Sequence, residues 1–149
     1  MIAKATAIQH GQAMTNYATK NNRADIVKTN HLSEGLPPMG MWDEMVLHQS
    51  MFKQRYAKKP IELTSIRFEI SPSEEEARNW SMEDWHRCLE EFIREIDAIS
   101  RVDHIGKRKG KTATSVRPTN IANSQYFAAI HRDSKSGIPH LHLVVNRID

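Results

Sequence analysis

The segment from residue 140 to residue 146 constrains the fold most, because its side chains alternate in character. In a β-strand, side chains two positions apart point to the same face of the sheet. The odd-numbered positions are leucine, leucine and valine, which suit a buried core, whereas the even-numbered positions begin with His140 and His142. The segment therefore predicts a strand with one apolar face and one histidine-bearing face.

A second strand-like segment, residues 125–131, precedes it and ends at His131. Residues 134–139, between the two segments, include Ser, Gly and Pro, which favour a turn. An antiparallel hairpin would bring His131 beside His140 and His142, and three imidazoles can converge on one metal ion. The alternative is a group of surface or core histidines that binds nothing, because short motifs carry false positives.

Two polar residues near these histidines fit supporting roles. Asp133 follows His131 by two positions, so on a continued strand it would share its face and could orient an imidazole or take a proton. Asn146 shares the face of His142 and could donate a hydrogen bond to the groups around the metal. With no carboxylate among the ligands, a divalent ion would keep its full charge, which suits binding of a phosphate oxygen.

The chain has 149 residues, enough for one domain with a buried core. Its composition, 39% hydrophobic and 26% charged with a mean hydropathy of −0.61, is typical of a soluble globular protein. No apolar run reaches membrane-spanning length, and the N-terminal residues lack the pattern of a signal peptide. The single cysteine, Cys88, argues against an internal disulfide or a thiolate cluster. We therefore expect a single cytoplasmic domain over residues 1–149.

Charge is distributed unevenly along the chain. Residues 71–97 hold nine acidic and three basic residues, a net charge of −6, whereas residues 101–120 hold six basic residues and one acidic residue, a net charge of +5. The centre of the basic segment is a glycine-flanked loop, which is a candidate contact for a phosphate backbone. A solvated loop that binds nothing is the alternative. The candidate contacts are Lys107, Arg108, Lys109 and Lys111.

Hydrophobic periodicity and turn residues predict the remaining elements. Strands with one polar and one apolar face favour an antiparallel sheet covered by helices on one side. The predicted fold is α+β: a two-layer sandwich with a mainly antiparallel sheet, helices on one face and the histidine cluster on the other. The predicted elements are strand 2–9, helix 12–20, loop 21–40, helix 41–58, strand 61–70, a helix that begins at Ser81 with a capping-box-like pattern, a hairpin or loop at 101–123, and strands 125–131 and 140–146.

Covalent phosphoryl chemistry at such a metal would need a nucleophile, and the chain has three tyrosines. Tyr126 is five residues before His131, so alternation places it on the opposite face. Tyr56 lies on a helical stripe with other aromatic residues, which is typical of a core position. Tyr17, close to the first predicted strand, is the best candidate, although packing is the more common role of a tyrosine with apolar neighbours.

At both ends of the chain these residues resemble a known family. The motif over residues 131–146, a His-x-Asp, a turn and then His-hydrophobe-His-x-x-x-Asn, resembles the signature of HUH endonucleases. The motif over residues 1–17, Met-Ile-Ala-Lys followed by His-Gly and a tyrosine, resembles the one that carries the nucleophile of relaxases, which mobilise plasmids and integrated elements. Residues 65–72 and 144–149 are similar to mobilisation proteins of Bacteroides-type elements.

The resemblance implies a chemistry. His131, His140 and His142 would hold a Mg²⁺ or Mn²⁺ ion that polarises the scissile phosphate at an origin of transfer. Tyr17 would attack this phosphate, forming a 5′-phosphotyrosyl link that the reverse reaction resolves. Asp133 would help to deprotonate Tyr17 or orient a ligand.

The resemblance also implies partners and an extent for the domain. The substrate would be single-stranded or hairpin origin-of-transfer DNA in the bacterial cytoplasm, together with accessory relaxosome proteins. Lys107, Arg108, Lys109 and Lys111 would contact the DNA backbone. Residues 1–149 would form one nicking domain, either complete or trimmed at its C-terminus, because relaxases usually continue beyond this motif.

Three other classes of protein share parts of the pattern. Histidine-triad nucleotide hydrolases need a third histidine where this chain has Val144. HUH replication initiators and transposases usually place their tyrosine after the histidine pair, on a later helix. A metal-binding or nucleic-acid-binding module without strand cleavage would not need Tyr17 at all.

Overall fold

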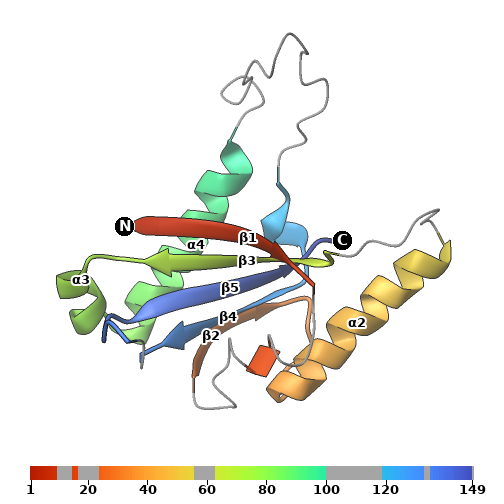
Figure 1. The fold of residues 1–149 in the computed structure, drawn as a ribbon, viewed down its shortest axis with the longest axis horizontal. Coiled ribbons are helices and arrows are strands. Elements are labelled where there is room, and N and C mark those ends of the chain that lie inside the picture. The colour runs from red at the N-terminus through yellow and green to blue at the C-terminus, as the bar shows by residue number, and fades with distance from the viewer. Residues whose placement is uncertain (10–14, 17–23, 56–62, 100–118, 133–134, 149) are drawn as a thin grey trace, which may run out of the picture.

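The structure of the protein is a computed structural model that describes six segments of the chain. These segments are residues 1–9, 15–16, 24–55, 63–99, 119–132 and 135–148. They form an α+β fold in which a five-stranded antiparallel sheet has helices packed against it (Figure 1). The elements are β1 (Ile2–Ile8), β2 (Asp25–Asn30), α2 (Pro38–Arg55), β3 (Ser65–Ser71), α3 (Glu74–Asn79), α4 (Met82–Ala98), the 3-10 helix η2 (Ile121–Asn123), β4 (Tyr126–His131) and β5 (His140–Asn146).

The strand order in the sheet is β1-β3-β5-β4-β2, so the hairpin of β4 and β5 occupies its centre. All residues of β4 are buried, and β5 is buried after its first residue. Gly137 has a φ of 67°, a left-handed conformation that glycine adopts without steric cost, and it helps the chain turn between the two strands. The predicted hairpin is therefore confirmed, and neighbouring strands flank it on both sides.

One face of the sheet packs against α4 and forms the larger part of the core. Trp85, Leu89 and Ile93 of α4 contact the apolar side chains of β3, β4 and β5. Leu141 and Leu143 lie in this cluster and are fully buried, which confirms the apolar face expected from the alternation of residues 140–146. The sequence pattern thus fixes which way the histidines point.

The opposite face, which carries the histidines, is partly covered by α2. Met41 and Met45 of this helix pack against Phe127 of β4 and Val144 of β5. The prediction that helices cover only one face is therefore wrong. α2 packs on the histidine face, toward the end of β5 that is opposite His140. Although α2 has 18 residues, no helix among the described segments is long and apolar enough to cross a membrane.

Other elements also differ from the sequence prediction: β3 begins at Ser65 rather than at residue 61, and the short helix α3 was not predicted. The segment predicted as a loop, 21–40, contains β2, which pairs with β4 through a register irregularity between Ile26 and Lys28. The helix predicted to begin at residue 41 begins at Pro38, because proline is tolerated in the first turn, where its missing N–H has no helical partner. Of the predicted helix 12–20, only residues 15–16 are described, and these two are helical.

The start of α4 confirms the predicted capping box. The Ser81 hydroxyl accepts a hydrogen bond from the backbone N–H of Asp84 (3.2 Å), and the Asp84 carboxylate accepts one from the backbone N–H of Ser81 (2.9 Å). These bonds satisfy N–H groups that have no partner within the helix, and they fix where α4 begins.

Replacing Ser81 with alanine should lower the free energy of unfolding by about 1 kcal/mol, because the N–H of Asp84 loses its acceptor. Urea unfolding followed by circular dichroism measures this change. Ser81→Thr keeps a hydroxyl acceptor and should lose much less, so equal losses in the two variants would contradict the capping role.

Candidate metal centre

The register of the central hairpin brings three histidines together. His131 ends β4 and His140 begins β5, and the two residues lie directly opposite each other in the antiparallel pair. His142, two positions further along β5, lies on the same face because strand side chains alternate. Sequence alternation and strand register therefore produce a cluster from residues on both sides of one turn.

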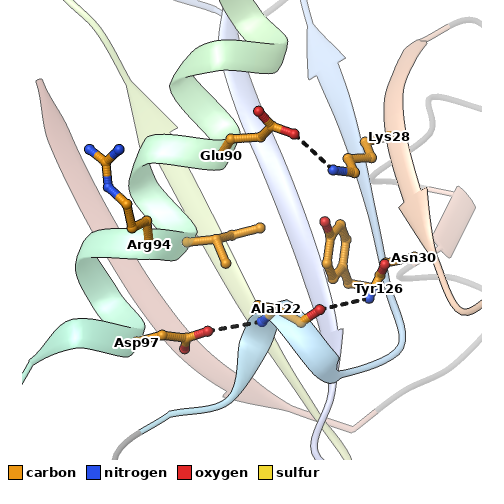
Figure 2. A pocket seen from close by; sticks show the side chains of 8 residues that line it. Lys28, Asn30, Glu90, Arg94, Asp97, Ala122 and Tyr126 are labelled. Carbon is orange, nitrogen blue, oxygen red and sulfur yellow. Dashed lines mark hydrogen bonds and ion pairs between the residues drawn. The ribbon is translucent and has the colours of Figure 1, made fainter.

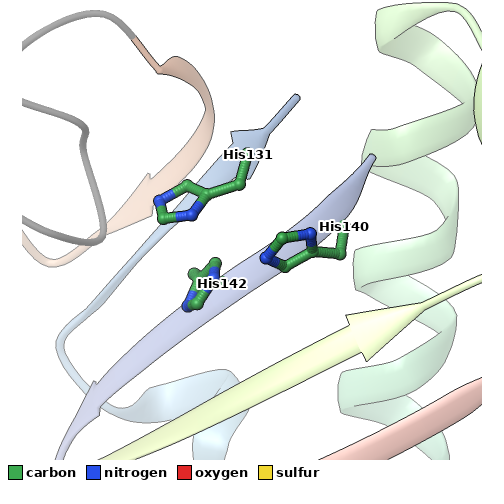
Figure 3. Close-up of side chains that lie close together, drawn as sticks. All are labelled: His131, His140 and His142. Atoms are coloured by element: carbon green, nitrogen blue, oxygen red, sulfur yellow. The ribbon is translucent and has the colours of Figure 1, made fainter. Parts of the chain in front are cut away.

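The three imidazoles face one another above the sheet (Figure 3). The ring centroids of His131 and His142 are 4.0 Å apart, those of His140 and His142 are 4.8 Å apart, and those of His131 and His140 are 5.3 Å apart. When one nitrogen is taken from each ring, the three nitrogens all lie within 4.8 Å of one another. The rings are close enough to share a single ion.

Hydrogen bonding selects which nitrogen of His140 can bind a metal. Its Nδ1 lies 3.2 Å from the carbonyl oxygen of Ile138, a geometry that suits donation from Nδ1–H. In this tautomer the lone pair is on Nε2, which is the usual arrangement for a metal-binding histidine whose other nitrogen is held by a carbonyl. His140 is half-buried, whereas His131 and His142 are buried, so His140 is the most exposed of the three.

The donor set fits a divalent metal ion. Nitrogen ligands about 2.1 Å from a tetrahedral metal lie roughly 3.5 Å apart, so small rotations of the three rings would suffice to share one ion. Three protein ligands leave open positions for water or substrate. Imidazole is a softer ligand than carboxylate, which favours Mn²⁺ over Mg²⁺, the two ions that the resemblance to relaxases implies.

Strand β3 adds two charged side chains to the histidine face. Glu69 is in register with His142, and Arg67 is in register with the next residue on that face of β5. Arg67 Nη2 and Glu69 Oε1 form an ion pair at 2.9 Å. Because these charges offset each other, this flank of the cluster adds little net charge to the site.

Asn146 lies on the predicted face but bonds away from the histidines. Its Nδ2 donates to the carbonyl oxygen of Met45 (3.3 Å) and to Gln125 Oε1 (3.1 Å). Its Oδ1 accepts from Gln49 Nε2 (3.2 Å) and from the backbone N–H of Ile148 (3.3 Å). These four bonds fill the capacity of the amide, so Asn146 ties α2 to the far end of β5.

Replacing Asn146 with alanine should lower the free energy of unfolding by about 2 kcal/mol, because several buried polar groups lose a partner at once. Gln49→Ala removes a single bond of this network and should cost less than half as much. Thermal and urea unfolding of both variants measure the difference. A stability of Asn146→Ala equal to that of the unmodified protein would contradict the anchoring role.

The two glutamines of this network were not anticipated from the sequence. Gln49 falls on the same helical stripe as Tyr56 in the predicted helix 41–58, and Gln125 begins the predicted strand 125–131. A polar residue within an apolar helical stripe could have indicated such a network, because a buried amide requires a hydrogen-bond partner. The partner itself lies 97 residues away from Gln49 in the sequence, and periodicity carries no information about it.

Several predicted site residues lie outside the described segments. These are Tyr17, Asp133, Lys107, Arg108, Lys109 and Lys111. Their roles remain predictions from the sequence, whereas the three histidines are brought together by the fold.

A pocket of about 430 Å³ lies against α4, β2 and the start of β4 (Figure 2). Its polar groups bond mainly to one another. Lys28 Nζ donates to Glu90 Oε1 at 3.0 Å, which raises the pKa of Lys28 and lowers that of Glu90. Asp97 accepts from two backbone N–H groups of η2, and Asn30 Nδ2 donates to the carbonyl oxygen of Ala122. These bonds link α4 and η2 to the edge of the sheet.

Tyr126 also lines this pocket, on the face that packs against α4. This position confirms the prediction that Tyr126 and His131 point to opposite faces. Burial raises the pKa of the Tyr126 phenol, which opposes its ionisation. Tyr126 is therefore not placed to attack a substrate at the histidine cluster.

Comparisons with protein-family models, with curated proteins and with solved structures found no match to this chain. The chemistry of the site and the sequence motifs therefore indicate the function. A histidine cluster on a central hairpin is compatible with several chemistries, because a fold does not determine a function.

Proposed function

We propose that the chain is a metal-dependent DNA relaxase that nicks single-stranded or hairpin DNA at an origin of transfer. The observation that supports this proposal most directly is the convergence of His131, His140 and His142, with their ligand atoms within 4.8 Å of one another. The resemblance of the two sequence motifs to relaxases supplies the candidate nucleophile, Tyr17, and the class of substrate. The proposed setting is the bacterial cytoplasm, with accessory relaxosome proteins as partners.

A Mg²⁺ or Mn²⁺ ion held by the three histidines would supply Lewis-acid polarisation of an oxygen of the scissile phosphate. In the proposed reaction, the phenolic oxygen of Tyr17 forms a bond to phosphorus while the bond from phosphorus to the 3′ oxygen breaks. Asp133 accepts the phenolic proton, and a proton from solvent water converts the departing 3′ oxygen to a hydroxyl. The reverse attack exchanges the same two bonds, so rejoining needs no external energy source.

The test is to incubate the protein with labelled single-stranded origin DNA and Mn²⁺, and to separate the products on a denaturing gel. We expect a covalent protein–DNA band that disappears when EDTA removes the metal. DNA cleaved without a covalent band would indicate a metal-activated water as the nucleophile and would overturn the tyrosine mechanism. DNA bound but never cleaved would support a binding module instead.

A further inference from the structure

Helix α2 carries apolar residues on the side that faces away from the sheet as well as on the side that packs against it. It lies at the margin of the molecule (Figure 1). Over residues 38–52 the exposed positions recur every four residues, and they are Met39, Asp43, Leu47 and Met51. Three of these four residues are apolar, and their exposed fractions lie between 43% and 62%.

Helix α4 shows how the other long helix of the structure meets solvent. Between residues 83 and 95 every exposed residue of α4 is charged, and the apolar residues of this range pack in the core. A surface helix of a globular protein typically has a single apolar stripe, and a helix with apolar residues all round is buried. The outer side of α2 therefore has the composition of a surface that packs against a partner.

The four-residue spacing makes this side of α2 suitable for packing against another helix. Side chains four positions apart form one of the ridges through which helices pack, and two such ridges interlock when the helices cross at about −50°. The neighbouring row on α2 consists of Trp42, Val46 and Ser50, which are half-buried and uncharged. A ridge from a second helix would therefore meet mainly uncharged side chains on both sides of Leu47.

The charges along α2 indicate a second copy of the chain, in antiparallel orientation, as the partner. Asp43 and Glu44 lie in the first half of the helix, whereas Lys53 and Arg55 lie in its last three residues. A two-fold axis at Leu47 places position 43 of one copy level with position 51 of the other, because both are four residues from the axis. The acidic half of each helix then lies beside the basic end of its partner, and the two charge patterns are complementary.

We propose that the outer side of α2 is a dimer interface, in which two copies of the chain pack antiparallel with Leu47 against Leu47 at the two-fold axis. Such an isologous contact uses the same surface of both copies, so it closes after two chains. α2 packs toward the end of β5 that is opposite His140. The inference goes beyond the proposed relaxase function, because the dimer is expected whether or not the chain nicks DNA.

The test is sedimentation equilibrium of the full chain over a wide range of concentration, without DNA or metal. We expect a reversible equilibrium between monomer and dimer. Leu47→Glu brings two carboxylates together at the axis and should raise the dissociation constant of the dimer about a hundredfold. Because Leu47 is 62% exposed in the single chain, this variant should keep the circular dichroism spectrum and the thermal unfolding midpoint of the unmodified protein.

The matched control is Met82→Glu, which introduces the same charge at an exposed apolar position of α4 and should dimerise normally. Leu47→Cys provides a second measurement, because two thiols that meet at the axis should form a disulfide between the chains on mild oxidation. The native Cys88 is buried. Glu83→Cys, at an exposed position of α4, should give far less covalent dimer on a non-reducing gel.

A chain that stays monomeric at every concentration would overturn the proposal. A dimer that Leu47→Glu leaves intact, or that gives no covalent link with Leu47→Cys, would overturn it as well, because its contact would lie on another surface. Association into species larger than a dimer would contradict the two-fold arrangement. The nicking assay is read separately, so failure of the relaxase reaction would leave this result unchanged.

Discussion

His140→Ala should reduce Mn²⁺-dependent nicking by about a thousandfold, because loss of one of three protein ligands removes the ion that stabilises charge on the phosphate. His140 is the best of the three positions for this test. It is half-buried, whereas His131 and His142 are buried and their replacement would also disturb packing. Isothermal titration with Mn²⁺ measures the metal affinity, and initial rates of nicking measure the activity.

The matched control is His86→Ala, which removes an exposed imidazole from α4. It should bind Mn²⁺ and nick DNA like the unmodified protein. If His140→Ala retained Mn²⁺ affinity and activity, the cluster would not be the catalytic metal site. The same titration with Mg²⁺ should show weaker binding than with Mn²⁺, as expected for three imidazole ligands.

Tyr17→Phe should abolish the covalent protein–DNA product while leaving DNA binding and Mn²⁺ binding intact. The substitution removes only the phenolic oxygen that forms the new bond to phosphorus. Denaturing gels measure the covalent product, and anisotropy measures DNA binding. Because Tyr17 carries the nucleophile in the proposed reaction, no residual covalent product is expected at long incubation times.

Tyr126→Phe is the control for this variant, since it removes a phenol from the other face of the sheet. It should form the covalent product at close to the normal rate. A covalent product that persists in Tyr17→Phe and disappears in Tyr126→Phe would refute the assignment of the nucleophile and require a different DNA path.

The sequence predicted those parts of the fold that depend on local patterns. Alternation in residues 140–146 gave both the strand and the face on which His140 and His142 lie, because strand periodicity is independent of the partner strand. The capping box at Ser81 likewise depends only on residues three positions apart. The convergence of His131 on the pair followed from the short turn of the hairpin.

Features set by distant contacts were not predictable in this way. The strand β2 is stabilised by pairing with β4, about 100 residues later in the chain, and its six residues have a weak pattern of their own. The position of α2 on the histidine face depends on how Met45 fits against Val144. Asn146 was assigned to the metal centre because it shares a face with His142, but its hydrogen bonds are decided by α2 and Gln125.

The strand order has a consequence for how the chain assembles during synthesis. β3 pairs with β1 and β5, and β4 pairs with β5 and β2, so β5 joins two otherwise separate ribbons of two strands each. A two-stranded ribbon alone is marginally stable in water. A growing chain that has not yet reached residue 146 therefore holds two unjoined pairs of strands with exposed apolar surface. Exposed apolar surface of this kind promotes aggregation and is bound by chaperones. Cooperative folding of the sheet and completion of the histidine cluster depend on the same seven residues.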